Sequence, residues 1–166
     1  MPMLIRWQDG RAAPAEDPYT AIADEDSIPN GEVIVSLARF QQEGERLLGE
    51  GRRVGVRIEA SEAIEDLAYD LPRISVVALV FPKWGQGQAY SSARLLRDRF
   101  GYKGEIRAVG DVLREQARFM VRCGFDAFVP ADDSSSQEWT HAVTRFRHVY
   151  QRGADHVAPA FEERQA

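Results

Sequence analysis

The sequence predicts an α/β fold in which strands and helices alternate around a mostly parallel, open sheet flanked by helices. Apolar runs of strand length recur along the chain, and amphipathic helical patterns lie between them. Residues 74–81 are apolar without alternation, which is typical of a central strand that is buried on both faces. The connections between the parallel strands are expected to be right-handed crossovers. Because the five expected strands cannot close an eight-stranded barrel, an open sheet with helices on both faces is favoured. The alternative is a half-barrel-like curved sheet, which a second chain could complete.

Residues 1–31 are predicted to form a hairpin and an arm that pack on the domain. Asp9-Gly10 is a turn signal, and it indicates a hairpin that returns through residues 11–13. Residues 14–30 mix prolines with acidic side chains, so we expect an irregular arm there. Disorder is the alternative, but the aromatic and aliphatic side chains of this segment favour docking.

Two strand–helix pairs are expected before the central strand. An apolar stripe at three- and four-residue steps predicts a helix over residues 37–48, between strands at 32–35 and 53–58. Ser61 is a suitable N-cap for the second helix, and acidic residues in its first turns suit the positive helix end. Pro72 ends this helix, because proline disfavours the helical conformation in the residue before it.

After the central strand, the pattern predicts a loop, a helix over residues 89–100 and a strand over residues 105–109. Gly101 is placed to end the helix in a left-handed conformation. Asp111 is placed to cap the following helix, which ends at Gly124. This capping role is favoured over a catalytic one.

The regular series ends with a strand over residues 127–129 and a helix capped within residues 134–136. The apolar stripe of this last helix extends to Tyr150. Residues 153–166 read as a tail. One α/β domain is therefore expected over residues 32–152.

Composition narrows the class of protein. The chain has 166 residues, 26 acidic and 21 basic, and a formal net charge of −5, which argues against nucleic-acid binding. It holds one cysteine, so no internal disulfide is expected and a reducing compartment is favoured. There is no apolar run of membrane-spanning length and no signal-peptide core, so we expect a cytoplasmic protein that does not enter the membrane.

No metal centre and no cofactor are expected. His141 and His148 would lie about 10 Å apart along one helix, too far to share an ion without a third element. Asp132-Asp133 is more typical of a solvated loop than of a metal site. Cys123 is expected to be buried at a helix C-terminus, where the dipole does not favour a thiolate.

The loop at residues 82–88 is the strongest candidate for a ligand site, because ligands bind at the carboxyl ends of parallel strands. Gly85 and Gly87 would let the backbone approach an anion at the following helix start. A charge at a helix start gains only about 0.3–1 kcal/mol, whereas micromolar binding needs about 8 kcal/mol. Lys83 and Arg107 would therefore have to converge on the loop. Two glycines in a tight turn and ordinary surface charges are the alternative.

The candidate site residues fall into three groups. Trp84 is the candidate contact with a partner, because we expect a large aromatic side chain in a glycine-rich loop to be exposed, and exposed aromatic side chains often anchor interfaces. Asp111 is the only candidate catalytic group, and a weak one. The candidate ligand-binding residues are Lys83, Gly85, Gly87, Tyr90, Ser91, Arg107 and Gly110.

Several motifs resemble one bacterial family over residues 32–130. They include F-P-K at residues 81–83, Y-S at 90–91, A-R-L-L-R at 93–97, F-G-Y at 100–102 and G-D-V-L at 110–113. The resemblance is to the bacterial domain-of-unknown-function family 934, whose members are described as involved in sulfite reduction on the basis of gene neighbourhood. Where that family usually has an acidic residue and an arginine in the loop, this chain has Gln86 and Gln88. Because both charged residues of the family are replaced together, a structural role is favoured for that charged pair.

The resemblance implies a non-redox accessory protein of assimilatory sulfite or nitrite reduction, which binds the reductase or a small anion. Sulfite reduction takes six electrons, normally through an iron–sulfur cluster held by several thiolates, and one cysteine cannot hold such a cluster. One alternative is a small α/β enzyme acting on an anionic substrate. Another is a structural or regulatory subunit without a ligand. The strand order and the oligomeric state stay open.

Overall fold

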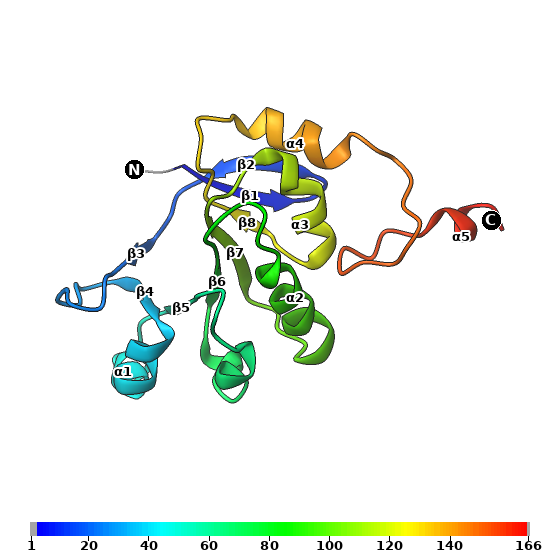
Figure 1. Cartoon of the computed structure of the whole chain (residues 1–166). Helices are drawn as coiled ribbons and strands as arrows, with labels where there is room; N and C mark the ends of the chain where they lie inside the picture. Colours follow the sequence, from blue (N-terminus) through cyan, green and yellow to red (C-terminus); the bar gives the residue numbers. More distant parts are fainter. Residues whose placement is uncertain (1–2, 166) are drawn as a thin grey trace.

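The computed structural model describes residues 3–165, and its core is one eight-stranded sheet (Figure 1). The strands follow the spatial order β2-β1-β8-β7-β6-β5-β4-β3. The strands are β1 (Leu4–Gln8), β2 (Arg11–Ala15), β3 (Tyr19–Ala21), β4 (Glu32–Ser36), β5 (Val54–Ile58), β6 (Val76–Phe81), β7 (Glu105–Gly110) and β8 (Ala127–Phe128).

Five α-helices lie among residues 3–165, and several are short. They are α1 (Leu37–Gly49), α2 (Gln88–Arg94), α3 (Ala117–Cys123), α4 (Ser136–Thr144) and α5 (Ala160–Glu163). A π-helical turn, Leu95–Arg99, continues α2, and 3₁₀ turns occupy Ile64–Leu67, Leu71–Arg73 and Arg114–Gln116.

The predicted alternation of strands and helices around a mostly parallel sheet is confirmed, and the sheet is curved like half of a barrel. Strands β3 to β8 neighbour one another in chain order and pair in parallel. When every crossover has the same hand and direction, successive helices fall on the same side of the sheet. The main core accordingly joins helix residues to alternate strand residues such as Val77 and Leu79.

The opposite, concave face has a small core of its own. Val76 and Ala78 lie on it with Tyr19 and Ile34, and no helix contributes to this cluster among the residues that the structure describes. The expectation of helices on both faces was therefore wrong, and the curved alternative is the arrangement observed. The sequential strand order is the cause, because an open sheet has helices on both faces only where the order reverses.

The N-terminal segment is part of this sheet. Asp9 and Gly10 both have positive φ, at 53° and 76°, and they close the expected hairpin between β1 and β2. Strand β1 also pairs antiparallel with β8. The arm was expected to be irregular throughout, yet β3 pairs in parallel with β4 and extends the sheet.

Three expectations about helices were wrong. The segment after Ser61 forms 3₁₀ turns, because the Glu62 carboxylate accepts a hydrogen bond from the Glu59 backbone N–H and closes a turn there instead. Asp111 caps no helix. Helix α4 ends at Thr144, so Tyr150 lies beyond it and is exposed. By contrast, the cap predicted within residues 134–136 is confirmed: Ser135 is the N-cap of that helix, and it forms reciprocal capping bonds with Glu138.

Candidate functional site

The carboxyl edge of the sheet is built by the ends of β6 and β7. Phe81 and Gly110 are in register there, and the Asp111 N–H donates to the Phe81 carbonyl oxygen at 2.8 Å. Gly110 has a φ of +95°, and a Cβ on it would lie 2.4 Å from that oxygen. Only glycine fits this position, so Gly110 has a structural function whatever binds nearby.

The loop after β6 is held from both sides at Trp84. The Trp84 N–H donates to Asp111 Oδ2 at 2.9 Å, and Gln116 Nε2 donates to the Trp84 carbonyl oxygen at 2.8 Å. A further backbone bond joins the Gln86 N–H to the Lys83 carbonyl at 2.9 Å. The Trp84 side chain is nevertheless 66% exposed. The indole is thus presented to solvent on a fixed backbone.

This arrangement gives Asp111 a different function from the two that the sequence suggested. Its carboxylate neither caps a helix nor stands free, because it accepts the Trp84 N–H from across the loop. The N-cap of the following 3₁₀ turn is Leu113, whose N–H donates to Gln116 Oε1 at 3.2 Å. Asp111 and Gln116 therefore act together to fix the loop.

We expect Asp111→Ala to lower the free energy of unfolding by about 1 kcal/mol, since one hydrogen bond at an exposed site is lost. Amide exchange at Trp84 should accelerate, as measured by hydrogen–deuterium exchange. Asp111→Asn keeps an acceptor oxygen and should retain most of the protection. Unchanged exchange at Trp84 in the alanine variant would show that the carboxylate does not hold the loop.

The other loop candidates are divided between surface and core. Lys83, Gly85, Gly87 and Ser91 are exposed, and a ligand-binding role for them stays a prediction. The glutamines at residues 86 and 88 are also exposed. The loop is therefore held by backbone groups, Asp111 and Gln116.

Tyr90 belongs to an aromatic cluster under the loop. Its ring lies 5.1 Å from that of Phe81 and 4.6 Å from that of Phe119, both edge to face. Burial raises the pKa of the Tyr90 hydroxyl. This packing stabilises the base of the loop.

Arg107 does not join Lys83 at the loop. It pairs in register with Ala78, three residues before the end of β6, or roughly 10 Å by strand rise. Its side chain is only 2% exposed, and its guanidinium donates to both Asp17 oxygens at 2.7 and 3.1 Å and to Glu105 at 2.7 Å. The convergence required for a strong anion site is therefore absent between these two residues.

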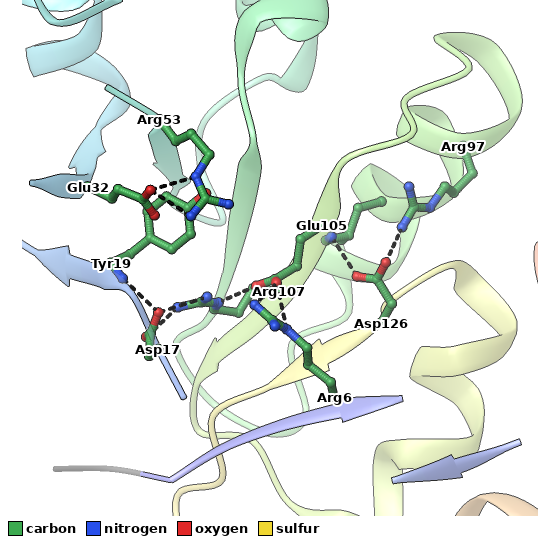
Figure 2. Close-up of polar contacts among 10 residues, drawn as sticks. Arg6, Asp17, Tyr19, Glu32, Arg53, Arg97, Glu105, Arg107 and Asp126 are labelled. Atoms are coloured by element: carbon green, nitrogen blue, oxygen red, sulfur yellow. Dashed lines mark hydrogen bonds and ion pairs between the residues drawn. The ribbon is translucent and has the colours of Figure 1, made fainter. Parts of the chain in front are cut away.

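Figure 2 shows the network that engages Arg107 on the concave face. Glu105 also accepts from Arg6 at 3.1 Å, so one carboxylate joins β1 to β7. The Tyr19 N–H donates to Asp17 at 3.1 Å, and the Arg107 guanidinium lies 5.7 Å from the centre of the Tyr19 ring. The network thus fastens the N-terminal arm to the sheet.

The register of the strands explains how small apolar residues on the concave face are shielded from solvent. Arg57, Ala78, Arg107, Ala127 and Arg6 are successive partners on adjacent strands. Both alanines are buried, and Ala78 belongs to the small cluster to which no helix contributes among the described residues. We infer that the long arginine stems on either side cover the alanines while their charges pair with carboxylates. In the sequence, this arrangement was visible only as one arginine in each of three strands. It was missed because the register that aligns these arginines was unknown.

Within residues 3–165, no group of three or more His, Cys, Asp or Glu side chains is placed to hold a metal ion. Cys123 is buried, and this burial raises the pKa of its thiol. No helix in the described part of the chain is both long and apolar enough to cross a bilayer.

Fold and site together define a small α/β protein with a half-barrel sheet and a fixed, exposed tryptophan at the carboxyl edge. The family model described as "Bacterial protein of unknown function (DUF934)" matches residues 55–161. The chain belongs to this family. No curated protein matches the sequence significantly.

Proposed function

We propose that this protein is a cytoplasmic, non-redox accessory protein of assimilatory sulfite or nitrite reduction that binds the reductase through Trp84. The observation that carries the proposal is the geometry of this residue. Its side chain is 66% exposed while its N–H and its carbonyl are both held by side chains from beyond β7.

Preorganisation makes this geometry favourable for binding. Tryptophan is over-represented among the residues that dominate interface energies. Ordering a flexible loop on association costs free energy, and a loop that is already held avoids most of that cost. The preceding residue, Lys83, is exposed and adds a positive charge to the same loop.

The pathway part of the proposal rests on the family resemblance and on the available ligating groups. One cysteine, Cys123, is present and it is buried. A reductase that carries an iron–sulfur cluster needs several thiolates, which must then come from another protein. An accessory function beside such a reductase is consistent with both points.

Deletion of the gene in the source bacterium tests the pathway. We expect the deletion strain to fail on sulfate and on sulfite as sole sulfur source and to grow on cysteine. Growth on nitrate or nitrite as sole nitrogen source tests the nitrite alternative in the same way. Normal growth on every source, in a strain without a second gene of this family, would contradict the pathway assignment.

Trp84→Ala tests the contact. We expect it to weaken binding of the purified reductase at least about tenfold in a calorimetric or surface-binding assay, with unchanged circular dichroism. Tyr69→Ala is the matched control, because Tyr69 is 88% exposed and precedes β6, whereas the loop follows the other end of that strand. Equal affinities of the Trp84 variant and the wild-type protein would remove Trp84 from the interface.

The alternative of a small enzyme acting on an anionic substrate required Lys83 and Arg107 to converge. Because Arg107 is buried in the ion network and Asp111 is engaged by the loop, the binding function is favoured.

A further inference from the structure

A second surface, independent of the Trp84 loop, lies between α3 and the segment that follows α4. Residues 145–151 and α3 enclose a shallow groove of about 710 Å³. We name it the C-terminal groove. Its lining includes four arginines, one histidine and two aromatic residues, and no acidic side chain among the residues that the structure describes: Arg118, Arg122, Arg145, Arg147, His148, Phe146 and Tyr150.

Two of these arginines hold the segment in place. The Arg118 guanidinium donates to the carbonyl oxygens of Val143 at 2.9 Å and of His148 at 3.2 Å. Arg122 donates to the Gln151 carbonyl and, at 2.7 Å, to Asp155. The groove is therefore a fixed feature, although its outer wall has no regular secondary structure.

The other two arginines are available to a partner. Within residues 3–165, neither Arg145 nor Arg147 forms an ion pair with an acidic side chain. The Arg145 guanidinium rests 5.3 Å from the centre of the Phe146 ring. Phe146 and Tyr150 are themselves exposed. Arg122 is paired with Asp155, and His148 Nδ1 lies 2.7 Å from a Glu163 carboxylate oxygen, so the exposed positive charge of the groove comes mainly from Arg145 and Arg147.

We propose that the C-terminal groove docks an acidic surface of a partner protein. Arginine and aromatic residues dominate interface energies, and complementary charge sets the orientation and speed of docking. The two unpaired arginines supply the charge, and Phe146 and Tyr150 supply apolar area. This proposal does not depend on the sulfite pathway or on Trp84.

A protein fits the groove better than a nucleic acid or a second copy. The net negative charge of the chain opposes a long polyanion. A symmetric dimer through this groove would place like charges opposite each other.

A fluorescein-labelled, glutamate-rich peptide serves as the probe, with binding to the full chain followed by fluorescence anisotropy. We expect saturable binding that weakens with salt. The double variant Arg145→Glu/Arg147→Glu should bind at least about tenfold more weakly. Arg11→Glu/Lys103→Glu is the matched control, since it changes the net charge equally at exposed positions elsewhere and should bind within about twofold of wild type.

Tyr150→Ala separates docking from general electrostatics, because it removes apolar area and no charge. Weaker binding by this variant supports a groove with a defined occupant. Circular dichroism and thermal melting establish that each variant is folded.

Four results would overturn the proposal. The first is absence of peptide binding at low salt. The second is equal weakening in the groove variant and the matched control. The third is tighter binding of a single-stranded oligothymidylate than of the acidic peptide, which would assign the groove to nucleic acid. The fourth is a dimer that the groove variant abolishes, which would assign it to a second copy.

Discussion

Arg107→Ala is expected to lower the free energy of unfolding by about 3–5 kcal/mol, the usual cost of removing one partner from a buried ion pair. The Arg107 side chain is 2% exposed, and it neutralises Glu105 and Asp17 together. Without it, Glu105 keeps its bond from Arg6, and the Asp17 carboxylate loses its two bonds from the Arg107 guanidinium. The link between the N-terminal arm and β7 is then broken. Urea denaturation with linear extrapolation measures the change.

Arg53→Ala is the control for this prediction. Arg53 also pairs with a carboxylate and lies 5.7 Å from the centre of the Tyr19 ring, but its side chain is 60% exposed. We expect it to cost less than about 1 kcal/mol, because exposed ion pairs contribute little. A cost below about 1 kcal/mol for Arg107→Ala as well would show that the network exchanges readily with solvent. Arg107 would then again be a candidate for binding an anion.

Gly110→Ala is expected to destabilise the protein by about 3 kcal/mol or more. A side chain at a positive φ costs of the order of 1–3 kcal/mol by itself. The added Cβ would also lie 2.4 Å from the Phe81 carbonyl oxygen, so the ends of β6 and β7 must separate. The bond from the Asp111 N–H to that oxygen would weaken, and Trp84 would lose its support. Thermal or urea unfolding and Trp84 amide exchange report both effects.

Gly85→Ala is the matched control within the same loop region. Gly85 does not have a positive φ, and a Cβ there would meet nothing within 4 Å. We expect a change of less than about 0.5 kcal/mol, as for most surface substitutions. If the Gly110→Ala variant and the wild-type protein had the same midpoint of urea unfolding, the close contact with Phe81 would not exist in solution. Gly110 would then not be required at this position.

Local patterns were enough for much of the secondary structure. Asp9-Gly10 predicted a hairpin turn because its two positive φ angles depend on those residues alone. The serines at residues 134–136 predicted the start of α4, because the capping bonds of Ser135 reach only three residues along the chain. The apolar run at residues 74–81 predicted a central strand because burial on both faces leaves no alternation. These features are encoded within a few residues, so they can be predicted without tertiary contacts.

The candidate site could be predicted only in part. The position of the loop at the carboxyl edge followed from the strand pattern, and the exposure of Trp84 was anticipated from its glycine-rich setting. The residues that fix the loop were not identified, because Asp111 and Gln116 lie 27 and 32 residues from Trp84. A carboxylate before a helical pattern looks like an N-cap in sequence, whereas the folded chain uses it across the loop.

Tertiary structure alone decided the curvature of the sheet and the environment of Arg107. Helices lie on one face because the strands are ordered sequentially, and strand order is a property of the whole sheet. Arg107 is buried because Asp17, 90 residues away, is brought beside it by the pairing of β3 with β4. Periodicity specifies which face of a strand is apolar. Only the register of distant strands determines which charged side chains meet on the other face. On that face Arg107, which was predicted to bind an anion, forms a structural ion pair with Asp17.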